Sequence, residues 1–212
     1  MNYIIDSSKA QKSCCVNYII LAIFILATIA IWLLHLNEKL FYIVNAWHVF
    51  LPNQVWNIIN IIAYPKVFIL PILLIILTSI FNREQLKKVV ILLVAYYVIF
   101  FVLKLLVHEA RPFVVLPPDT IFFLLNHQDV SHNRYLSFPS GHTGIMVVFA
   151  FAAIKVLKIN NKLAKFILFL LPIIVGVTRL ATGWHWPIDV LASGIIGYIL
   201  VEIFFFNNKC TR

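Results

Sequence analysis

The sequence has few charged residues, and acidic residues are the scarcest of them. Only 12% of its 212 residues are charged, whereas 62% are hydrophobic. A soluble domain is about 25% charged and about 45–50% apolar. The composition therefore excludes an ordinary soluble domain and a disordered chain, and it indicates an integral membrane protein. The shortage of acids leaves a net charge of +9, which on a membrane protein favours lysine-rich cytoplasmic loops and a site for anions.

Cysteine is also scarce. The three cysteines are Cys14, Cys15 and Cys210, near the two ends of the sequence. Adjacent cysteines rarely form a disulfide, and this spacing matches no metal-ligand pattern. A polar stretch that contains His127 and His132 resembles a metal site only weakly. We therefore expect no metal and no other cofactor.

Six apolar runs are separated by charged residues or by proline. They cover residues 18–35, 66–81, 89–107, 143–159, 163–180 and 188–206. Because a helix needs about 20 apolar residues to cross a bilayer, the pattern predicts one all-α domain over residues 1–212, an integral membrane bundle of six transmembrane helices. Residues 37–54 are expected to lie at the membrane interface. Residues 55–63 either belong to the second span or lie along the interface as well.

Lysine and arginine are divided unevenly between the two ends of this bundle. Eleven of the 17 fall at the termini and in the loops 82–88 and 155–165, and six fall at the opposite end. The positive-inside rule therefore places both termini in the cytoplasm and turns the segments 108–140 and 180–187 outward. All five tryptophans fall at this outer end, which is the pattern of an interfacial aromatic belt.

Polar residues at the outer ends of four predicted spans reach one membrane depth. One pair ends the third span, a Ser-Gly-His group begins the fourth, an arginine ends the fifth, and a His–Asp pair begins the sixth. Because consecutive spans run in opposite directions, the end of the third, the start of the fourth, the end of the fifth and the start of the sixth all lie at the same end of the bundle. These residues are Lys104, Arg111, Ser140, Gly141, His142, Arg179, His185 and Asp189.

Three of them, Lys104, Arg111 and Arg179, are fixed positive charges. Arg111 follows Lys104 by seven residues, so the two share a face if the helix continues that far. A cluster of cations at a membrane face is unfavourable without an anion, and a phosphate fits the fork of a guanidinium group. Lys104 considered alone is equally well explained by snorkelling to the lipid headgroups.

The segment Pro139-Ser140-Gly141-His142 precedes a predicted helix. Helix N-termini offer unpaired N–H groups and a partial positive charge, both of which suit an anion. Gly141 would let the backbone approach a ligand closely. Taken alone, Ser140 is explained as well by a helix N-cap.

His185 and Asp189 frame the start of the sixth span. Pro187 fits the first turn of a helix, so Asp189 lies in that turn and can reach one imidazole nitrogen of His185. The other nitrogen is then a candidate nucleophile. With His142 as the acid for the leaving group, the combination suggests phosphoryl transfer through a phosphohistidine. The plainer explanation of the pair is a helix-start carboxylate beside an interfacial histidine.

The order and spacing of these residues resemble a known signature. The groups Lys104-x6-Arg111-Pro112, Pro139-Ser140-Gly141-His142 and Arg179-x5-His185-x3-Asp189 resemble the three-part motif of the type-2 phosphatidic acid phosphatase superfamily. The surrounding sequence is most similar to the phosphatidylglycerophosphatase B type. Thr178 departs from the pattern, because the family often has serine before the arginine.

The resemblance implies a role for each residue. His185 would attack phosphorus, Asp189 would hold the imidazole tautomer, and His142 would protonate the departing lipid oxygen. No metal would be required, because the cations replace a metal clamp. The phosphate-binding residues would be Lys104, Arg111, Ser140, Gly141 and Arg179.

The leading hypothesis is an integral membrane phosphatase at the periplasmic or outer face of the cytoplasmic (inner) membrane. It would remove a terminal phosphate from phosphatidylglycerol phosphate, undecaprenyl diphosphate or phosphatidic acid. A lipid A phosphatase or a lipid phosphotransferase of the same superfamily is the alternative within the enzyme class. A non-catalytic anion or lipid transporter is the alternative outside it, but a pure binding site has no use for an oriented His185–Asp189 pair.

The expected partners are the phosphorylated lipid substrate and the lipid bilayer. No nucleic acid and no obligatory protein partner is expected. Apolar stretches within residues 112–138 predict that this segment dips into the outer leaflet beside the site as a lid for acyl or prenyl chains.

Overall fold

The computed structural model describes residues 19–125, 130 and 134–205, and every regular element in these ranges is helical. The predicted all-α class is confirmed. The longer helices are Ile19–Leu33, α2 (Asn37–Asn45), α3 (Asn53–Ile62), α4 (Ile69–Phe81), α5 (Leu86–Val107), α8 (Gly141–Val156), α9 (Lys162–Ala181) and α10 (Pro187–Phe205). The short ones are η1 (Ala46–Phe50), η2 (Pro65–Val67), η3 (Arg83–Gln85), α6 (Pro112–Val115) and η4 (Pro118–Thr120).

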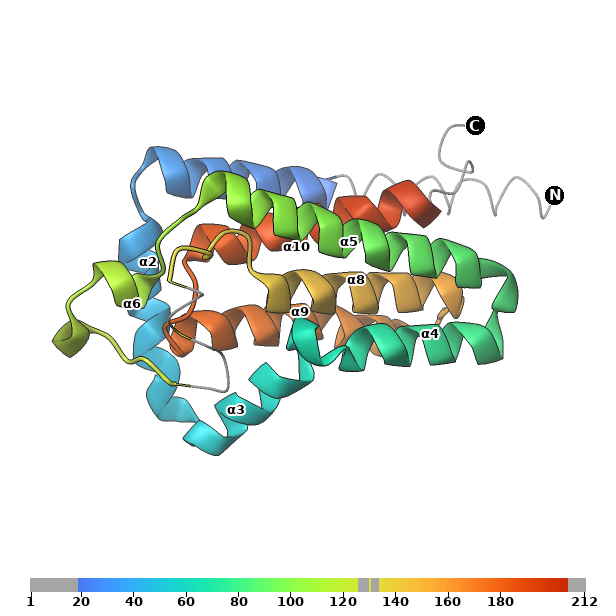
Figure 1. Ribbon diagram of the computed structural model, residues 1–212, viewed down its shortest axis with the longest axis horizontal. Helices are drawn as coiled ribbons and strands as arrows, with labels where there is room; N and C mark the ends of the chain where they lie inside the picture. The colour runs from blue at the N-terminus through green and yellow to red at the C-terminus, as the bar shows by residue number, and fades with distance from the viewer. Residues whose placement is uncertain (1–18, 126–129, 131–133, 206–212) are drawn as a thin grey trace.

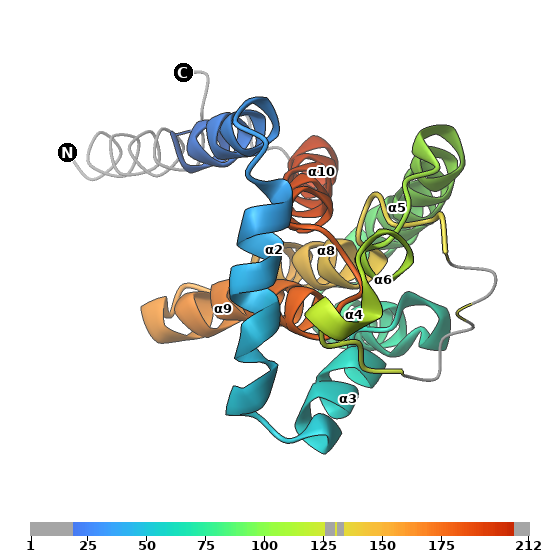
Figure 2. The ribbon, with the colours of Figure 1, turned by 90° about the vertical axis from the view of Figure 1, so that its left-hand side faces the viewer.

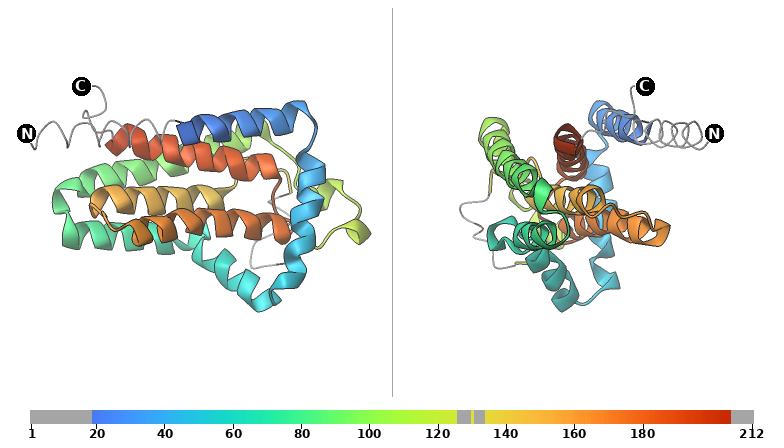
Figure 3. Two further views of the ribbon diagram at one scale, coloured as in Figure 1. Left: turned by 180° about the vertical axis from the view of Figure 1, so that it is seen from behind. Right: turned by 90° about the vertical axis from the view of Figure 1, so that its right-hand side faces the viewer.

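The bundle is built around α8. Helices α4, α5, α9 and α10 run beside it along the long axis of the molecule (Figures 1 and 3), and α8 packs most extensively on α9 and α10. Every side chain over residues 142–150 is buried. Gly144 allows this packing, because a Cβ there would lie 2.3 Å from the Phe100 ring of α5. The N-terminal half of α8 is therefore fixed at the centre of the fold.

Three stretches are long and apolar enough to cross a membrane. They are Arg83–Val115, which contains α5, together with α9 and α10, and the bent pair Ile19–Leu33 and Asn37–Phe50 makes a fourth if it counts as one span. Helices α4 and α8 are apolar but shorter, with 13 and 16 residues. The described ranges therefore contain three to four candidate spans, and each of the six predicted runs contains a helix.

The second predicted run is interrupted. Helices α3 and α4 are separated by residues 63–68, which include η2 and end at Phe68 with φ 60°. A left-handed residue cannot continue a helix, and Pro65 lies just before it. Residues 55–63 therefore belong to a separate helix that turns away from α4 at the lower corner of Figure 1.

Helix α5 ends before Arg111. His108 has φ 48° and caps the helix after Val107, and Arg111 is extended with φ −77° and ψ 157°, as the residue before a proline prefers. The expectation that Lys104 and Arg111 share one helix face is wrong. Arg111 reaches the site from a connecting segment instead.

Helix α2 lies across one end of the bundle. The chain bends by 105° between Ile19–Leu33 and Asn37–Phe50, and Figure 2 shows α2 passing over the ends of the long helices. An interfacial segment at residues 37–54 would follow this transverse course. Several expectations fall outside the described residues, namely the positions of the cysteines, of His127 and His132, and of residues 126–129 and 131–133 of the predicted lid.

Candidate active site

The eight residues singled out in the sequence come together at the end of the bundle that α2 crosses. They arrive from α5, the segment after it, the start of α8, the end of α9 and the start of α10. The contacts below join them into one buried cluster. The predicted convergence is thus a feature of this structure.

His185 lies between a carboxylate and a guanidinium group. Its Nδ1 is 3.1 Å from Asp189 Oδ2, and its Nε2 is 3.2 Å from Arg111 Nη1. A guanidinium group donates hydrogen bonds and accepts none, so Nε2 is the acceptor and Nδ1 carries the proton. Burial, followed by the positive charges of Arg111 and Arg179, lowers the pKa of His185 well below its usual range. The imidazole is therefore neutral, with its lone pair on Nε2.

Asp189 is held rigidly in the first turn of α10. Its Oδ2 accepts hydrogen bonds from Ser137 Oγ at 2.6 Å and from the Trp186 N–H at 2.9 Å, in addition to His185. The residue is fully buried. The hydroxyl and the backbone N–H fix the position of this carboxylate oxygen, and the oxygen in turn fixes the orientation of the imidazole. Sequence reasoning did not identify Ser137 as one of these donors.

Arg111 and Arg179 both lie against the ring of Trp184. Each guanidinium carbon is 5.2 Å from the ring centroid. Arg111 also donates to the carbonyls of Trp184 and Leu136 at 2.7 and 3.1 Å. The buried indole donates its own N–H to the Leu124 carbonyl at 2.9 Å. Cation–π attraction to one ring thus partly offsets the repulsion between the two like charges.

The expected aromatic belt is wrong for three of the five tryptophans. Trp56, Trp184 and Trp186 are 4%, 0% and 7% exposed, and each indole N–H donates to a backbone carbonyl. Position in the sequence sets the depth of a residue in the membrane, but the packing of the connecting segments sets its burial. Trp184 is therefore part of the site.

Asn60 of α3 is a site residue outside the three motifs. It is 3% exposed, and its Oδ1 accepts a hydrogen bond of 2.6 Å from Arg179 Nη1. Sequence reasoning missed it, although a signal was present, because Asn60 is an amide between two pairs of isoleucines. Such a residue inside an apolar run needs a polar partner.

His142 is also anchored by α3. Its imidazole stacks on the ring of Tyr64 with centroids 5.3 Å apart and planes at 13°, and it hydrogen-bonds to the backbone of Asn60. Helix α3 ends at Ile62, so the Asn60 carbonyl is one of the last four, which lack partners within the helix. The imidazole satisfies that carbonyl, and the bond determines which ring nitrogen carries the proton.

Helix α8 begins at Gly141, beside the other site residues, and the first N–H groups of a helix have no partner within it. Ser140 precedes the helix without capping it, because its hydroxyl lies 3.0 Å from Thr143 Oγ1. The Gly141 carbonyl accepts a 2.7 Å hydrogen bond from the Tyr96 hydroxyl. A Cβ at Gly141 would lie 3.2 Å from Pro65. The first turn of α8 is thus closely packed, and its N–H groups favour an anion.

Lys104 fixes the segment that leads into α8. Its ammonium donates to the carbonyls of Leu136, Ser137 and Pro139 at 2.8, 3.4 and 2.7 Å. An ammonium has three protons to donate, so these carbonyls account for its capacity. Lys104 therefore shapes the Ser-Gly-His turn, and its direct contact with phosphate stays a prediction.

Residues 112–125 are tied to α2. Asn45 donates to the carbonyls of Phe122 and Leu180 at 2.9 and 3.1 Å and accepts from the Phe122 N–H at 2.8 Å. The Tyr42 and Thr120 hydroxyls are 3.2 Å apart. The part of the predicted lid that the structure describes is thus fastened beside the site, and its function as a lid stays a prediction.

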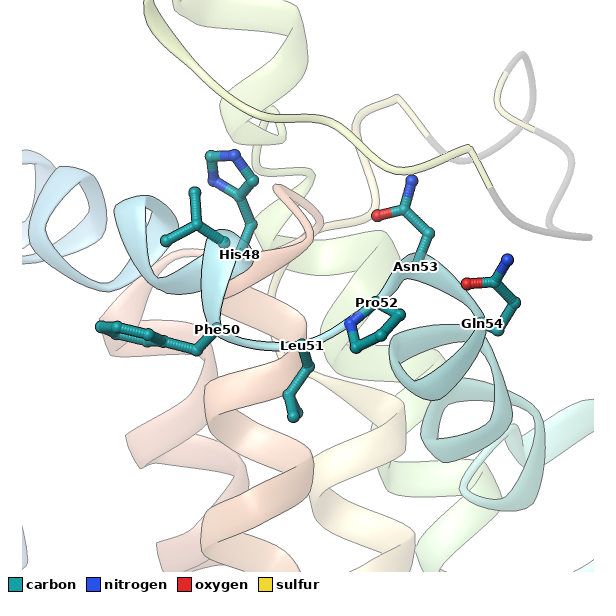
Figure 4. A pocket seen from close by; sticks show the side chains of 7 residues that line it. His48, Phe50, Leu51, Pro52, Asn53 and Gln54 are labelled. Atoms are coloured by element: carbon teal, nitrogen blue, oxygen red, sulfur yellow. The ribbon is translucent and has the colours of Figure 1, made fainter.

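A surface pocket lies at the turn between η1 and α3. It measures about 520 Å³, and Figure 4 shows His48, Asn53 and Gln54 on one side of the turn, with Phe50 and Leu51 on the other. The His48 ring stacks on Phe122 with centroids 4.0 Å apart. None of the eight predicted residues lines this pocket, so we do not assign the chemistry to it.

Within the described ranges, no three His, Cys, Asp or Glu side chains gather as metal ligands would. The expectation of a metal-free site stays a prediction.

Comparison with protein-family models gives a match over the C-terminal part of the chain. The model of the PAP2 superfamily matches residues 85–208, from the end of η3 through α10. This range contains all eight candidate residues. It is more than half of the 212-residue chain.

A curated relative is the undecaprenyl-diphosphatase BcrC of Bacillus subtilis (strain 168). It is 30% identical over 105 residues, which are 49% of this chain and 48% of that protein. The match thus spans about half the length of each.

Two solved structures have a similar fold. The crystal structure of Aquifex aeolicus LpxE has a TM-score of 0.63 and 28% identity, covering 80% of this chain and 94% of its own. The crystal structure of the first transmembrane PAP2 type phosphatidylglycerolphosphate phosphatase from Bacillus subtilis has a TM-score of 0.61 and 21% identity. It covers 86% of this chain and 90% of its own. At that identity the second likeness concerns the fold alone.

Proposed function

The chain belongs to the PAP2 superfamily, and on that premise we propose that it is an integral membrane phosphatase that hydrolyses the terminal phosphate of a lipid phosphate or diphosphate through a phosphohistidine. The observation that carries this proposal is the position of His185 between Asp189 and Arg111. A binding protein has no need for a buried, neutral imidazole whose tautomer is fixed by a carboxylate.

The first chemical step is attack of His185 Nε2 on phosphorus. A bond forms between Nε2 and phosphorus, and the bond from phosphorus to the lipid oxygen breaks. His142, which is an imidazolium in the substrate complex, donates to that oxygen the proton of the ring nitrogen that does not bond to Asn60. Asp189 stabilises the positive charge that develops on His185. Arg111, Arg179 and the N–H groups of α8 stabilise the phosphoryl oxygens by electrostatics and positioning, as is general for phosphoryl transfer.

The second step returns His185 to its starting state. Water attacks the phosphohistidine, the bond between nitrogen and phosphorus breaks, and inorganic phosphate leaves. The proton of the attacking water passes to His142, which lost its own to the lipid oxygen.

The proposed topology follows the distribution of lysine and arginine. We place six helices across the cytoplasmic membrane, with both termini in the cytoplasm and the site at the outer face. Helices α4 and α8 are short for a full crossing, at about 1.5 Å per residue, and this bundle would need a locally thin bilayer around them. The substrate would then reach the site from the outer leaflet.

Direct assay of purified protein tests this proposal. Undecaprenyl diphosphate, phosphatidylglycerol phosphate and phosphatidic acid are compared at equal concentration in detergent, and at least one is expected to release phosphate. The relative named undecaprenyl-diphosphatase makes a lipid diphosphate the first substrate to try. Excess chelator is expected to leave the rate unchanged, since the cations replace a metal. Strict dependence on added magnesium would contradict this mechanism.

Two variants locate the nucleophile. His185→Asn is expected to abolish turnover and to prevent rapid-quench trapping of a radioactive phosphoryl group on the protein. His35→Asn is the matched control, because His35 is exposed and has φ 52°, a conformation that asparagine tolerates. Near-normal activity of His185→Asn would overturn the assignment of His185.

A further inference from the structure

The site contains buried donors around Arg179 that lack an acceptor. In the described part of the chain, Arg179 Nε, Arg179 Nη2 and Asn60 Nδ2 are buried and have no hydrogen-bond partner. Buried polar groups are rarely left unpaired, because each costs the full free energy of its desolvation. Two side chains thus bring three donor atoms to one place.

The orientation of the Asn60 amide follows from its partner. Arg179 Nη1 is 2.6 Å from Asn60 Oδ1, and a guanidinium group only donates. The amide must therefore turn its oxygen to Arg179, which leaves both protons of Nδ2 unused beside the same guanidinium group. A tetrahedral anion with several acceptor oxygens satisfies the amide and the guanidinium donors together.

The same residue touches the proposed general acid. The backbone of Asn60 hydrogen-bonds to the imidazole of His142, while its side chain holds Arg179. Asn60 thus joins two parts of the site that lie on different helices, α8 and α9. It does so from α3, which lies outside the residues matched by the superfamily model.

We propose that Asn60 is a phosphate-binding residue, whose Nδ2 donates to an oxygen of the transferred phosphoryl group while its Oδ1 orients Arg179. This inference rests on the proposed function. It adds a neutral donor, supplied by α3, to the charged donors of the three motifs. The alternative is that Asn60 serves only to dock α3 against Arg179.

Asn60→Asp and Asn60→Leu together separate these two roles. The aspartate keeps an acceptor for Arg179, so the docking of α3 is preserved, but it removes both amide protons and places a negative charge beside the anion. This variant is expected to bind the anion poorly while its unfolding temperature equals or exceeds that of the wild type. The leucine removes the amide without adding charge. If Asn60 donates to phosphate, Asn60→Leu weakens binding as well. If Asn60 only docks α3, Asn60→Leu lowers the unfolding temperature and keeps the wild-type affinity.

The experiment measures the affinity of the purified full-length protein for vanadate, a mimic of five-coordinate phosphorus, by titration calorimetry in detergent. Asn60→Asp is expected to weaken binding at least about tenfold, which is the scale of a hydrogen bond to a charged group. Asn60→Leu, which is similar in volume and uncharged, is expected to weaken it as well. Asn53→Asp is the matched control, because Asn53 is exposed at the start of α3, and it is expected to bind as the wild type does.

Wild-type affinity in either Asn60 variant overturns the inference. The result for Asn60→Leu shows whether loss of the amide alone, without added charge, weakens binding. Lipid phosphate hydrolysis by the wild type is measured in parallel. An active wild type whose Asn60 variants bind vanadate normally refutes only the role of Asn60. A wild type that binds vanadate and hydrolyses none of the lipids refutes the proposed function instead.

Discussion

The residues of the site act in small groups rather than singly. Ser137 and Asp189 orient His185, Asn60 and Arg179 are joined side chain to side chain, and Trp184 lies against both arginines. Each group combines residues of the three motifs with one supporting residue, which is Ser137, Asn60 or Trp184. The supporting members govern orientation, so their removal should alter rates more than folding.

Ser137→Ala tests this view. The substitution removes the 2.6 Å hydrogen bond to Asp189 Oδ2 and leaves a side chain of nearly the same shape. Because a hydrogen bond to a charged group contributes about 1.5–3 kcal/mol, kcat is expected to fall about tenfold or more, with KM little changed. Steady-state kinetics on a lipid phosphate measure this, with Ser79→Ala on the exposed side of α4 as the control. A rise in KM alone would mean that Ser137 acts in binding.

The pH profile tests the state of His185. Burial and the neighbouring arginines lower the pKa of His185, so the neutral nucleophile persists as the pH falls below the usual histidine range of about 6.5. The acid limb of kcat/KM assigned to His185 is therefore expected below that value. Arg111→Gln removes a positive charge that disfavours the imidazolium, so it should move the limb to higher pH. A limb that does not move would show that it belongs to another group.

The motif residues could be predicted from the sequence because their order and spacing match a family signature. The alternating direction of consecutive spans also brings them to one end of the bundle. Tyr64 and Ser137 could not be predicted, since their roles depend on how the segments around η2 and before α8 pack. The sequence marks Asn60 only as a polar residue in an apolar run, and its partner depends on how α3 packs. Trp184 could not be predicted as a site residue either. The sequence does not distinguish a tryptophan in an interfacial belt from one that packs against two guanidinium groups.

At the scale of elements, the helices follow the apolar runs but their ends do not. Helix α5 ends at His108, and α4 begins after Phe68, both with left-handed backbones. Glycine usually marks such positions, and neither residue is glycine, so the sequence offers little warning. These two breaks release Arg111 from α5 and separate α3 from α4. They therefore produce the two features that the sequence predicted least well.

Close packing of α5 on α8 gives a prediction about stability. Gly144→Ala would place a Cβ 2.3 Å from the buried Phe100 ring, and overpacking of this kind costs about 1–3 kcal/mol. The unfolding temperature in detergent is expected to fall. Gly194→Ala is the matched control, because a Cβ at Gly194 meets nothing within 4 Å, and alanine favours a helix. Equal unfolding temperatures would contradict the tight contact between α5 and α8.

At the scale of the whole molecule, the site and the basic connections lie at opposite ends. The connections from α4 to α5 and from α8 to α9 share the end away from α2 (Figure 1). Together with the adjoining helix ends, over residues 82–88 and 155–165, they contain seven of the 17 lysines and arginines. A lysine of this end, Lys155, pairs with Glu202 at 3.0 Å. The proposed topology assigns this end to the cytoplasm.

Thiol labelling of intact cells tests that orientation. With Cys14, Cys15 and Cys210 changed to serine, Tyr135→Cys is expected to react with a membrane-impermeant maleimide, because Tyr135 is 48% exposed at the site end. Asn160→Cys, in the exposed connection between α8 and α9, should react only after the cells are permeabilised. The reverse labelling pattern would place the site end in the cytoplasm and would exclude an outward-facing site.

Trp184 gives the protein an optical reporter of its own. Its indole touches both guanidinium groups, so neutralising them with an anion changes the electric field across the ring and hence its fluorescence. No other tryptophan of the described residues has a cation–π contact, so Trp184 is expected to respond most. Occupancy of the proposed phosphate site is therefore expected to be measurable in real time without a label, from the protein's own fluorescence.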